Sequence, residues 1–459
     1  MWSALKDGAD FNPPLLYFVT HSLFRLAGDS AIVSRLPAMV GFYVMCFCLY
    51  RVVSNRCGPV YGLAAMVFPL LSPAYYYAAE ARPYGLVLGF SGLALLSWQE
   101  LAEGRRRWFF VPLFGISMLG AVQSHCYAVL LLIPFGVAEV IRAITRKRAD
   151  ALAVGCLVCA AASTLVYLPL LSAIGRYRRL PTYFFAPRLS SIAEGIQGLF
   201  GLGVWPVLLV FVFACATGGR RANRINTGKV APHEIACYSL LALMPLWVFA
   251  VSLATNGSFM PRYAVPAVIG LSVLLCLLVH HSTAGDRATA GVMAHVFFIS
   301  WLALSVPWPW TRAEAAPAYA LPAASIADFR PDLPIVVSNA LTFLESDHDL
   351  AKEAAARLVF LTDANFALAY TGTEVFDKAF YTLSKWFPIR GTVTDYETFL
   401  AAHRRFLVFG PYTYPEDWLI PRLLREQIKL TLRGQFRGRY GDYVLLEAEL
   451  PEFSQGPAR

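Results

Sequence analysis

Residues 60–100 read VYGLAAMVFPLLSPAYYYAAEARPYGLVLGFSGLALLSWQE, and this stretch decides what kind of protein the chain forms. It contains two apolar runs, 60–78 and 84–100, separated by a short turn with Glu80 and Arg82. A helix needs about 20 mainly apolar residues to cross the hydrocarbon core of a bilayer. The two runs are therefore predicted to be membrane helices, and the charged turn is predicted to lie at a membrane boundary.

Similar apolar runs occur on both sides of this stretch. Read in windows of about 19 residues, the chain contains about ten predicted spans, at residues 31–52, 60–78, 84–100, 109–124, 126–142, 151–174, 204–216, 235–254, 264–282 and 292–307. The 459 residues are 57% hydrophobic and only 15% charged, whereas soluble domains average about 45–50% apolar residues. The composition favours an α-helical polytopic membrane protein.

The distribution of basic side chains predicts how the helices cross the membrane. Arginine and lysine gather in the loops after the first, third, fifth and seventh spans, while the other loops, apart from 175–203, carry few. Basic loops tend to remain in the cytoplasm. The other loops, the N-terminal segment and the region after residue 307 are therefore predicted to face outward from the inner (plasma) membrane. The net charge of +9 then reflects membrane orientation rather than nucleic-acid binding.

Four parts follow along the chain: an outward segment with an interfacial helix (1–30), a transmembrane domain (31–310), a linker (311–330) and a soluble extracytoplasmic domain (331–459). The last part has an ordinary domain size. Its short apolar runs predict strands, and the segments between them predict helices. The predicted strands are 334–338, 357–361, 405–409 and 443–447, and the predicted helices are 395–402 and 418–430, so the domain is expected to be α/β.

An outward N-terminus requires translocation, but residues 1–20 have neither the basic nor the apolar region of a signal peptide. We therefore expect an upstream transmembrane helix that this chain lacks. The alternative is that the short tail crosses the membrane together with the first span.

The N-terminal segment holds the first candidate site residues, Asp7, Asp10 and Asn12, directly before the pair Pro13-Pro14. Proline fixes φ and disfavours helix before it, so the carboxylates are predicted to sit on a rigid turn near the membrane surface. The alternative interpretation is that the prolines only begin an interfacial helix, with both aspartates in water.

The outward turns supply the other candidates. Charged residues close to lipid tend to be paired or functional, although the tyrosines around Glu80 and Arg82 also fit an ordinary aromatic belt. The guanidinium groups of arginines in the long loop 175–203 could bind phosphate groups. The alternative is that these arginines have no function, because long loops are translocated regardless of their charge. An isolated histidine at a membrane edge is more often packed than metal-bound. The candidates in these turns are Tyr84, His125, Arg179, Arg262 and Tyr263.

Four motifs in this order, DFNPPLLY (10–17), SRLP (34–37), YAAEARPY (77–84) and MPRY (260–263), resemble the GT-C glycosyltransferases. The resemblance is to the bacterial relatives of dolichyl-phosphate-mannose protein mannosyltransferases and aminoarabinose transferases, and it covers about residues 7–310. Each motif alone is weak, but the ordered set is fairly specific. No nucleotide-binding loop, zinc-protease motif or serine elbow is present.

The resemblance implies transfer of a hexose or pentose, with inversion, from a polyprenyl-phosphate donor to an extracytoplasmic glycan, lipid or protein. It also implies an acidic general base and basic side chains on the phosphate. Relatives usually carry the base at the end of a first helix that this chain lacks, which makes Asp10 and Asp7 substitutes or supporting residues. They often have Lys or His where this chain has Asn12, so phosphate binding falls to Arg82, Arg262 or the loop arginines.

The leading hypothesis is therefore a glycosyltransferase with Asp10, Glu80 and Asp7 as acid/base candidates. The other candidates, Asn12, Arg82, Tyr84, His125, Arg179, Arg262 and Tyr263, would contact substrate. No cofactor is predicted, and a divalent metal is left open by the resemblance. Membrane lipid is an expected partner, and nucleic acid is not. One alternative is a transporter or flippase of a lipid-linked precursor, but the sequence shows no inverted repeats of the kind that transporters often have. The other alternative is a non-catalytic membrane scaffold.

Overall fold

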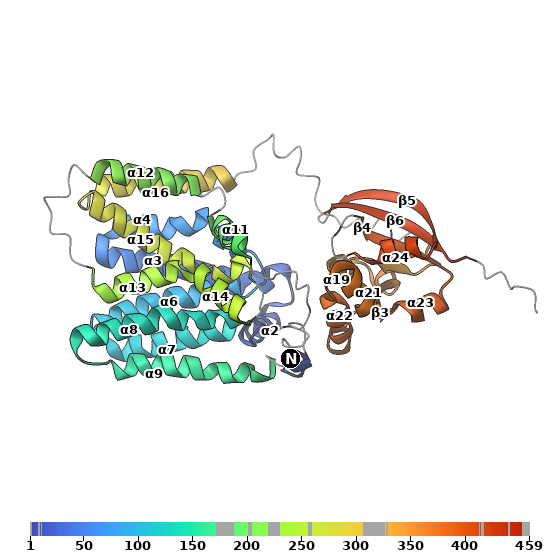
Figure 1. The fold of residues 1–459 in the computed structure, drawn as a ribbon, viewed down its shortest axis with the longest axis horizontal. Coiled ribbons are helices and arrows are strands. Elements are labelled where there is room, and N and C mark those ends of the chain that lie inside the picture. Colours follow the sequence, from blue (N-terminus) through green and yellow to red (C-terminus); the bar gives the residue numbers. More distant parts are fainter. Residues whose placement is uncertain are drawn as a thin grey trace, which may run out of the picture. The chain divides into compact units, whose positions relative to one another are not determined.

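The computed structural model describes residues 2–7, 10, 12–170, 188–200, 204–218, 230–255, 259–305, 326, 329–412, 414, 417–438 and 441–451. The chain divides into two compact units. The first is helical and lies within residues 12–306, and the second combines the N-terminal helix α1 (Trp2–Asp7) with the region after residue 307. Figure 1 shows a bundle of helices in the first unit and a sheet with helices in the second.

Helices form every described secondary-structure element of the first unit. Its elements are, in chain order, α2 (Leu15–Ala27), α3 (Ala31–Cys57), α4 (Pro59–Val67), η1 (Phe68–Leu71), α5 (Ala74–Ala78), α6 (Tyr84–Ala102), α7 (Arg107–Ser124), η2 (Cys126–Leu131), α8 (Leu132–Arg146), α9 (Ala151–Ala162), η3 (Ser163–Tyr167), α11 (Leu189–Phe200), α12 (Val204–Gly218), α13 (Pro232–Ala242), α14 (Met244–Thr255), η5 (Pro261–Ala264), α15 (Ala267–Ser282) and α16 (Arg287–Ser305). The predicted helical membrane fold is confirmed.

Each of the ten predicted spans contains described helix, but the helices differ in length. Within the described residues, five helical segments are long and apolar enough to cross a membrane, and a bent pair makes up to six. The bent pair is α13 and α14, which meet at an angle of 58° where one straight span was predicted. Shorter apolar helices, α2, α4 with η1, and α15, occur besides these. The number of crossings therefore stays a prediction.

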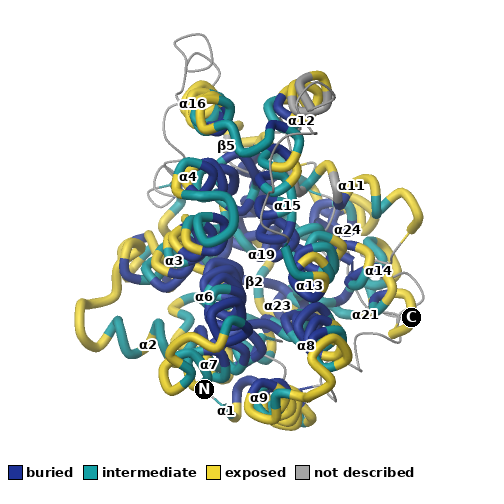
Figure 2. The backbone as a smooth tube through the Cα atoms, turned by 90° about the vertical axis from the view of Figure 1, so that its left-hand side faces the viewer, coloured by how far each residue is buried: buried dark blue, intermediate teal, exposed yellow. Residues whose placement is uncertain are grey.

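Helix α6 lies at the centre of the bundle, and 83% of its most apolar 18-residue window is buried. Figure 2 shows it as a mainly buried helix with α3 and α7 near it. Small residues allow α3 to approach α6 closely, because a Cβ at Gly89 would lie 2.6 Å from the Cα of Gly41. Close packing of small residues is a usual way for membrane helices to associate. This close packing fixes the position of the N-terminal end of α6 relative to α3.

A six-stranded sheet organises the second unit, with the order β3-β2-β1-β4-β6-β5. The first four strands in that order are parallel, and β6 and β5 join antiparallel. The strands are β1 (Ile335–Val337), β2 (Leu358–Thr362), β3 (Thr392–Asp395), β4 (Arg405–Pro411), β5 (Lys429–Gly438) and β6 (Gly441–Glu449). The helices are α19 (Ala340–Asp349), α20 (Lys352–Ala355), α21 (Ala364–Thr371), α22 (Val375–Trp386), α23 (Tyr396–Ala402) and α24 (Leu419–Arg425). All four predicted strands and the α/β class are confirmed.

One predicted helix of this unit is wrong at its end. The expected helix 418–430 ends at Arg425, the chain turns at Gln427 with a φ of 57°, and Lys429 begins β5. The segment from Lys429 to Leu432 alternates polar and apolar residues, which is a strand pattern. It was assigned to the helix because it follows the helical run directly. Strands β3 and β5 were not predicted.

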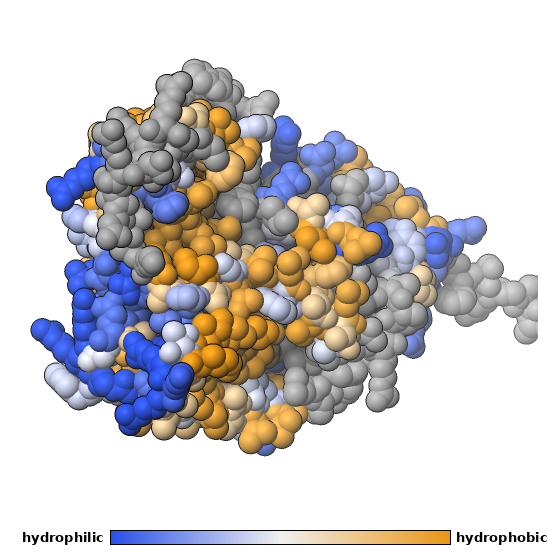
Figure 3. Space-filling view, turned by 60° about the vertical axis from the view of Figure 1, so that its left-hand side comes forward, coloured by the Kyte–Doolittle hydropathy of each residue, from blue (hydrophilic) through white to orange (hydrophobic). Residues whose placement is uncertain are grey.

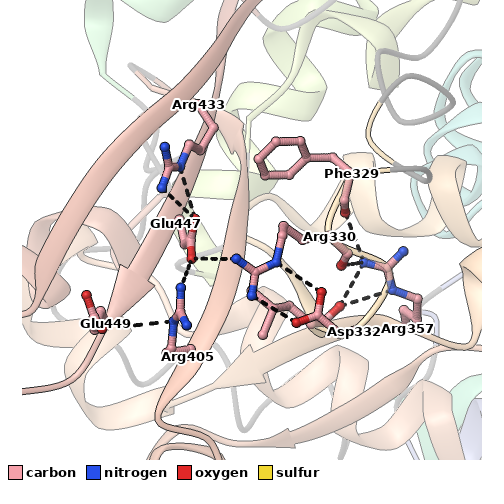
Figure 4. A network of polar contacts seen from close by, with 9 residues as sticks. Phe329, Arg330, Asp332, Arg357, Arg405, Arg433, Glu447 and Glu449 are labelled. Carbon is pink, nitrogen blue, oxygen red and sulfur yellow. Dashed lines mark hydrogen bonds and ion pairs between the residues drawn. The ribbon is translucent and has the colours of Figure 1, made fainter.

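Ion pairs connect the antiparallel strands β4, β6 and β5 of this sheet. Figure 4 shows Glu447 of β6 between arginines from neighbouring strands. Its carboxylate accepts from Arg405 of β4 at 2.6 Å and from Arg433 of β5 at 3.0 Å, and Arg330 lies at 3.5 Å. The ion pairs keep the pKa of Glu447 below its usual range. A buried carboxylate needs such partners, so this network is explained by the stability of the sheet.

Candidate functional site

The turn between α5 and α6 presents two of the predicted site residues. Glu80 and Arg82 lie between the short helix α5 and Pro83, which caps α6, and the Arg82 N–H donates to the Glu80 carbonyl at 2.8 Å. Proline at this position disfavours helix before it, so the turn is fixed by local sequence. The Arg82 Nε lies 3.5 Å from Glu80 Oε2, and the side chains are 50% and 19% exposed.

Two other turns reach the same end of the helical unit. Helices α6 and α7 are consecutive and packed together, so the first residue of α6, Tyr84, and the residue after α7, His125, belong to one end. His125 has extended backbone between α7 and η2. The third turn is η5, which begins after the extended residue Met260 and carries Arg262 and Tyr263.

Ring contacts join the three turns into one cluster. The ring centroid of Tyr84 lies 4.9 Å from that of Tyr77 and 5.4 Å from that of His125. His125 lies 5.1 Å from Tyr263, and Tyr263 stacks on Tyr127 at 4.7 Å with an interplanar angle of 13°. We call these five residues the aromatic cluster. It brings together side chains that are more than 180 positions apart in the chain.

Arg262 lies against this cluster without an acidic partner. Its guanidinium carbon is 5.7 Å from the Tyr263 ring, and its positive charge contributes to the lowered pKa of His125. Its Nε is buried and has no hydrogen-bond partner among the described residues. No ion pair of Arg262 with a carboxylate occurs in the described part of the chain. A buried donor atom without a partner is costly, so Arg262 is a candidate for binding an anion.

His125 is held as a neutral hydrogen-bonding group. The backbone N–H of Tyr127 donates to His125 Nδ1 at 3.2 Å, so the ring proton of the neutral form is on Nε2. Burial, assisted by the positive charge of Arg262, lowers the pKa of His125 to about 4. Among the described residues of these three turns, two arginines therefore face one carboxylate, Glu80, at neutral pH. The described turns carry an excess positive charge that suits a phosphate group.

Among the predicted residues of the N-terminal segment, Asp7 and Asp10 belong to the second unit and Asn12 begins the first. Asp7 ends α1 in the second unit, and its Oδ2 accepts from Trp386 Nε1 at 2.9 Å. Asp10 and Asn12 are partly buried and have interactions of their own. Arg179 lies outside the described residues. The structure thus brings six of the ten predicted residues to one end of the bundle: Glu80, Arg82, Tyr84, His125, Arg262 and Tyr263.

Two members of the cluster were not predicted as site residues. Tyr77 stands within the motif YAAEARPY but was read as part of an aromatic belt. Tyr127 was assigned to a membrane span, and its hydroxyl lies 3.1 Å from Ser252 Oγ of α14. The sequence feature that could have indicated Tyr127 is its position two residues after the candidate His125. Among the described residues, no three His, Cys, Asp or Glu side chains gather in a group that could hold a metal ion.

Comparison with known proteins gives a family match over part of the chain and a fold shared with solved structures. Residues 12–167 match the family model of the dolichyl-phosphate-mannose-protein mannosyltransferases, which is about a third of the chain. Two crystal structures of ArnT from Cupriavidus metallidurans, one in the apo state and one bound to undecaprenyl phosphate, match 95% of this chain and 87% of theirs. The TM-scores are 0.53 and 0.54 at 13% identity. Comparison with curated protein sequences gives no significant match.

Proposed function

We propose, from the GT-C fold that this chain shares with those structures, that it is a glycosyltransferase using a polyprenyl-phosphate-linked sugar donor. The acceptor is an extracytoplasmic glycan, lipid or protein. The observation that carries the proposal is Arg262, a half-buried cation with an unpartnered Nε and no carboxylate against it among the described residues. The family match over residues 12–167 and the undecaprenyl phosphate named for the similar ArnT structure support the choice of donor.

Arg262 and Arg82 are proposed to hold the donor phosphate. The phosphate becomes the leaving group, and its negative charge grows as the bond to the sugar breaks. Fixed cationic donors stabilise that developing charge. Arginine does so with two parallel hydrogen bonds. Arg82 is half exposed and close to Glu80, so it can turn to the phosphate while Arg262 remains fixed against the tyrosines.

Glu80 is proposed as the general base. Among the described residues, its Oε2 is buried without a hydrogen-bond partner, and the Arg82 guanidinium lies 3.5 Å away. In the reaction, the acceptor hydroxyl attacks the anomeric carbon, Glu80 takes the hydroxyl proton, and polyprenyl phosphate leaves with the electron pair of the broken C–O bond. Attack from the face opposite the phosphate gives inversion. Asp10 and Asp7 remain candidates for the same role by their place before Pro13.

The aromatic cluster is proposed to bind the sugar and the first part of the lipid chain. Stacked Tyr127 and Tyr263 offer a flat apolar face, and the neutral His125 offers a hydrogen-bond donor beside it. Tyr84 and Asn12 complete the proposed substrate contacts, with Arg179 from the long loop. The arginine distribution supports an outward-facing site, with the C-terminal unit on the same side of the inner membrane.

Release of polyprenyl phosphate tests this function. Purified protein in detergent would be given a panel of undecaprenyl-phosphate-linked hexoses and pentoses with cell-envelope extract as the acceptor source, and free undecaprenyl phosphate would be measured. The wild type is expected to release it, and Glu80→Gln is expected to reduce release at least a hundredfold. Glu194→Gln, at an exposed site on α11, is the matched control. A protein that moves lipid-linked precursors without releasing undecaprenyl phosphate is a flippase, and the proposal then fails.

A further inference from the structure

A second arginine-rich site lies at the other end of the helical unit. A cavity of about 530 Å³ opens where α7 begins, α8 ends and α9 begins. Its lining includes Arg107, Arg142, Arg146, Arg148 and Asp150. Figure 3 shows hydrophilic side chains gathered at one end of the bundle, directly beside a broad hydrophobic face.

This cavity is separated from the candidate active site by the length of a membrane helix. Helix α7 has 18 residues, with Arg107 at its start and His125 directly after its end. At about 1.5 Å per residue, these two positions are roughly 27 Å apart along the helix axis. That distance approaches the roughly 30 Å thickness of the hydrocarbon core. The cavity therefore belongs to the opposite leaflet from the proposed donor site, the one that the arginine-rich loops assign to the cytoplasm.

Two arginines of the cavity are held by carboxylates. Arg107 donates to both oxygens of Asp150 at 2.8 Å. Arg142, which is 2% exposed, donates to Asp150 and to Glu139, both at 2.8 Å. These pairs build a fixed wall. They also hold the pKa of Asp150 far below its usual range, so its charge is constant.

The other two arginines add charge that this wall does not neutralise. Arg146 donates to the backbone carbonyl of Ala102, and no ion pair of Arg146 or Arg148 with a carboxylate is formed within the described residues. The four arginines carry four positive charges, and Asp150 and Glu139 carry two negative charges. The net charge of these six side chains is therefore +2. Arg148 is exposed and can reach a ligand.

Exposed apolar side chains accompany the lining residues, because Leu152 belongs to the lining and Trp108 and Phe109 follow Arg107 in the chain. Trp108 is 80% exposed, Leu152 is 55% exposed and Phe109 is 46% exposed. The cavity also lies between two candidate spans, Cys126–Arg146 and Ala151–Leu170. A ligand in it would have its anionic part among arginines and an apolar part along the helices. A free phosphate ion would use only the first of these features.

We propose that this cavity binds the head group of an anionic phospholipid, such as phosphatidylglycerol or cardiolipin, in the leaflet opposite the candidate active site. Basic pockets between membrane helices on the cytoplasmic side recognise such head groups. The phosphate accepts from Arg146 and Arg148, while Arg107 and Arg142 keep the cavity open through Asp150. The acyl chains lie against the exposed apolar residues of α7 and α9. The site is independent of the proposed sugar transfer.

Lipid retention measured by native mass spectrometry tests the proposal. The purified protein in detergent is titrated with phosphatidylglycerol, cardiolipin or phosphatidylcholine. The wild type is expected to retain the two anionic lipids and not phosphatidylcholine. The double variant Arg146→Gln, Arg148→Gln is expected to bind them roughly tenfold more weakly or worse, since each basic residue near an anionic surface contributes to lipid affinity.

The matched control is Arg51→Gln, Arg106→Gln, which removes two exposed arginines from the same end but outside the cavity lining. It is expected to retain anionic lipid like the wild type. Equal loss in both double variants, or retention of phosphatidylcholine equal to that of phosphatidylglycerol, would overturn the proposal. Displacement of the lipid by millimolar inorganic phosphate would also overturn it, because the site would then recognise a free anion.

Discussion

Arg142 and Arg262 occupy opposite ends of the same bundle and have opposite surroundings. Arg142 is almost fully buried and is held by Glu139 and Asp150. Arg262 is only half-buried, its Nε has no hydrogen-bond partner in the described part of the chain, and tyrosines surround it. Two carboxylates neutralise Arg142 within the protein, whereas Arg262 lies among phenol rings, and we propose that an anionic ligand is its partner. This contrast supports a structural role for Arg142 and the proposed binding role for Arg262.

The largest expected effect is on activity, at Arg262. Arg262→Gln removes the fixed positive charge that the leaving phosphate requires, and we expect release of polyprenyl phosphate to fall by about 10²–10³-fold. Thermal unfolding in detergent should change little, since no carboxylate loses its partner. Arg25→Gln, at an exposed position in the last turn of α2, is the control. Normal turnover by the Arg262 variant would remove the distinction between the two ends.

At the end of the bundle that contains Arg142, we expect a loss of stability without a loss of activity. Glu139→Gln leaves Arg142 with one carboxylate and weakens the bond from Trp98 Nε1, which is 2.6 Å from Glu139 Oε1. Breaking a buried ion pair costs about 3 kcal/mol or more of folding free energy. Chemical unfolding in detergent, followed by tryptophan fluorescence, measures this loss, and activity of the folded fraction should persist. Stability within about 0.5 kcal/mol of the wild type would contradict the assigned role.

A pH effect is expected at His125 and sharpens the contrast between the ends. Its pKa is lowered to about 4 in the folded protein, against 6.5 for the free group. Between these values the unfolded chain binds the proton and the folded one does not, so stability falls as pH drops from about 6.5 to 4. The loss reaches about 3 kcal/mol below that window.

His125→Asn should flatten this part of the stability curve. The comparison of wild type and variant at pH 7.5 and pH 4.5 isolates the histidine from other titrating groups. If both proteins lose the same stability on acidification, His125 is not a buried neutral base.

The smallest expected effect is at Tyr127. Tyr127→Phe removes the hydroxyl that lies 3.1 Å from Ser252 Oγ but keeps the ring stacked on Tyr263. We expect a loss of about 1 kcal/mol in stability and nearly unchanged turnover. Tyr43→Phe, at an exposed tyrosine of α3, is the control. A strong loss of turnover would mean that the hydroxyl, and not the ring face, contacts substrate.

Much of the fold could be predicted from local sequence because hydropathy and proline placement act locally. Helices form at every predicted span, the helix expected after Pro13-Pro14 is α2, and four strands of the C-terminal sheet lie where apolar runs predicted them. The break between α13 and α14 at Leu243 was not predicted, because both halves lie in one apolar run, although Pro245 stands two residues after it. The same holds for β5, whose strand pattern follows a helical run without a proline or glycine between them.

For the site, the sequence alone determined that Glu80 and Arg82 lie in a proline-bounded turn between two apolar runs, because charge and proline exclude that turn from the membrane interior. Only the tertiary structure decided that Tyr84, His125 and Arg262 meet, since contacts over such separations depend on how helices pack. It also decided which arginines have acidic partners. Pairing depends on distances between side chains from different helices, and composition carries no information about those distances.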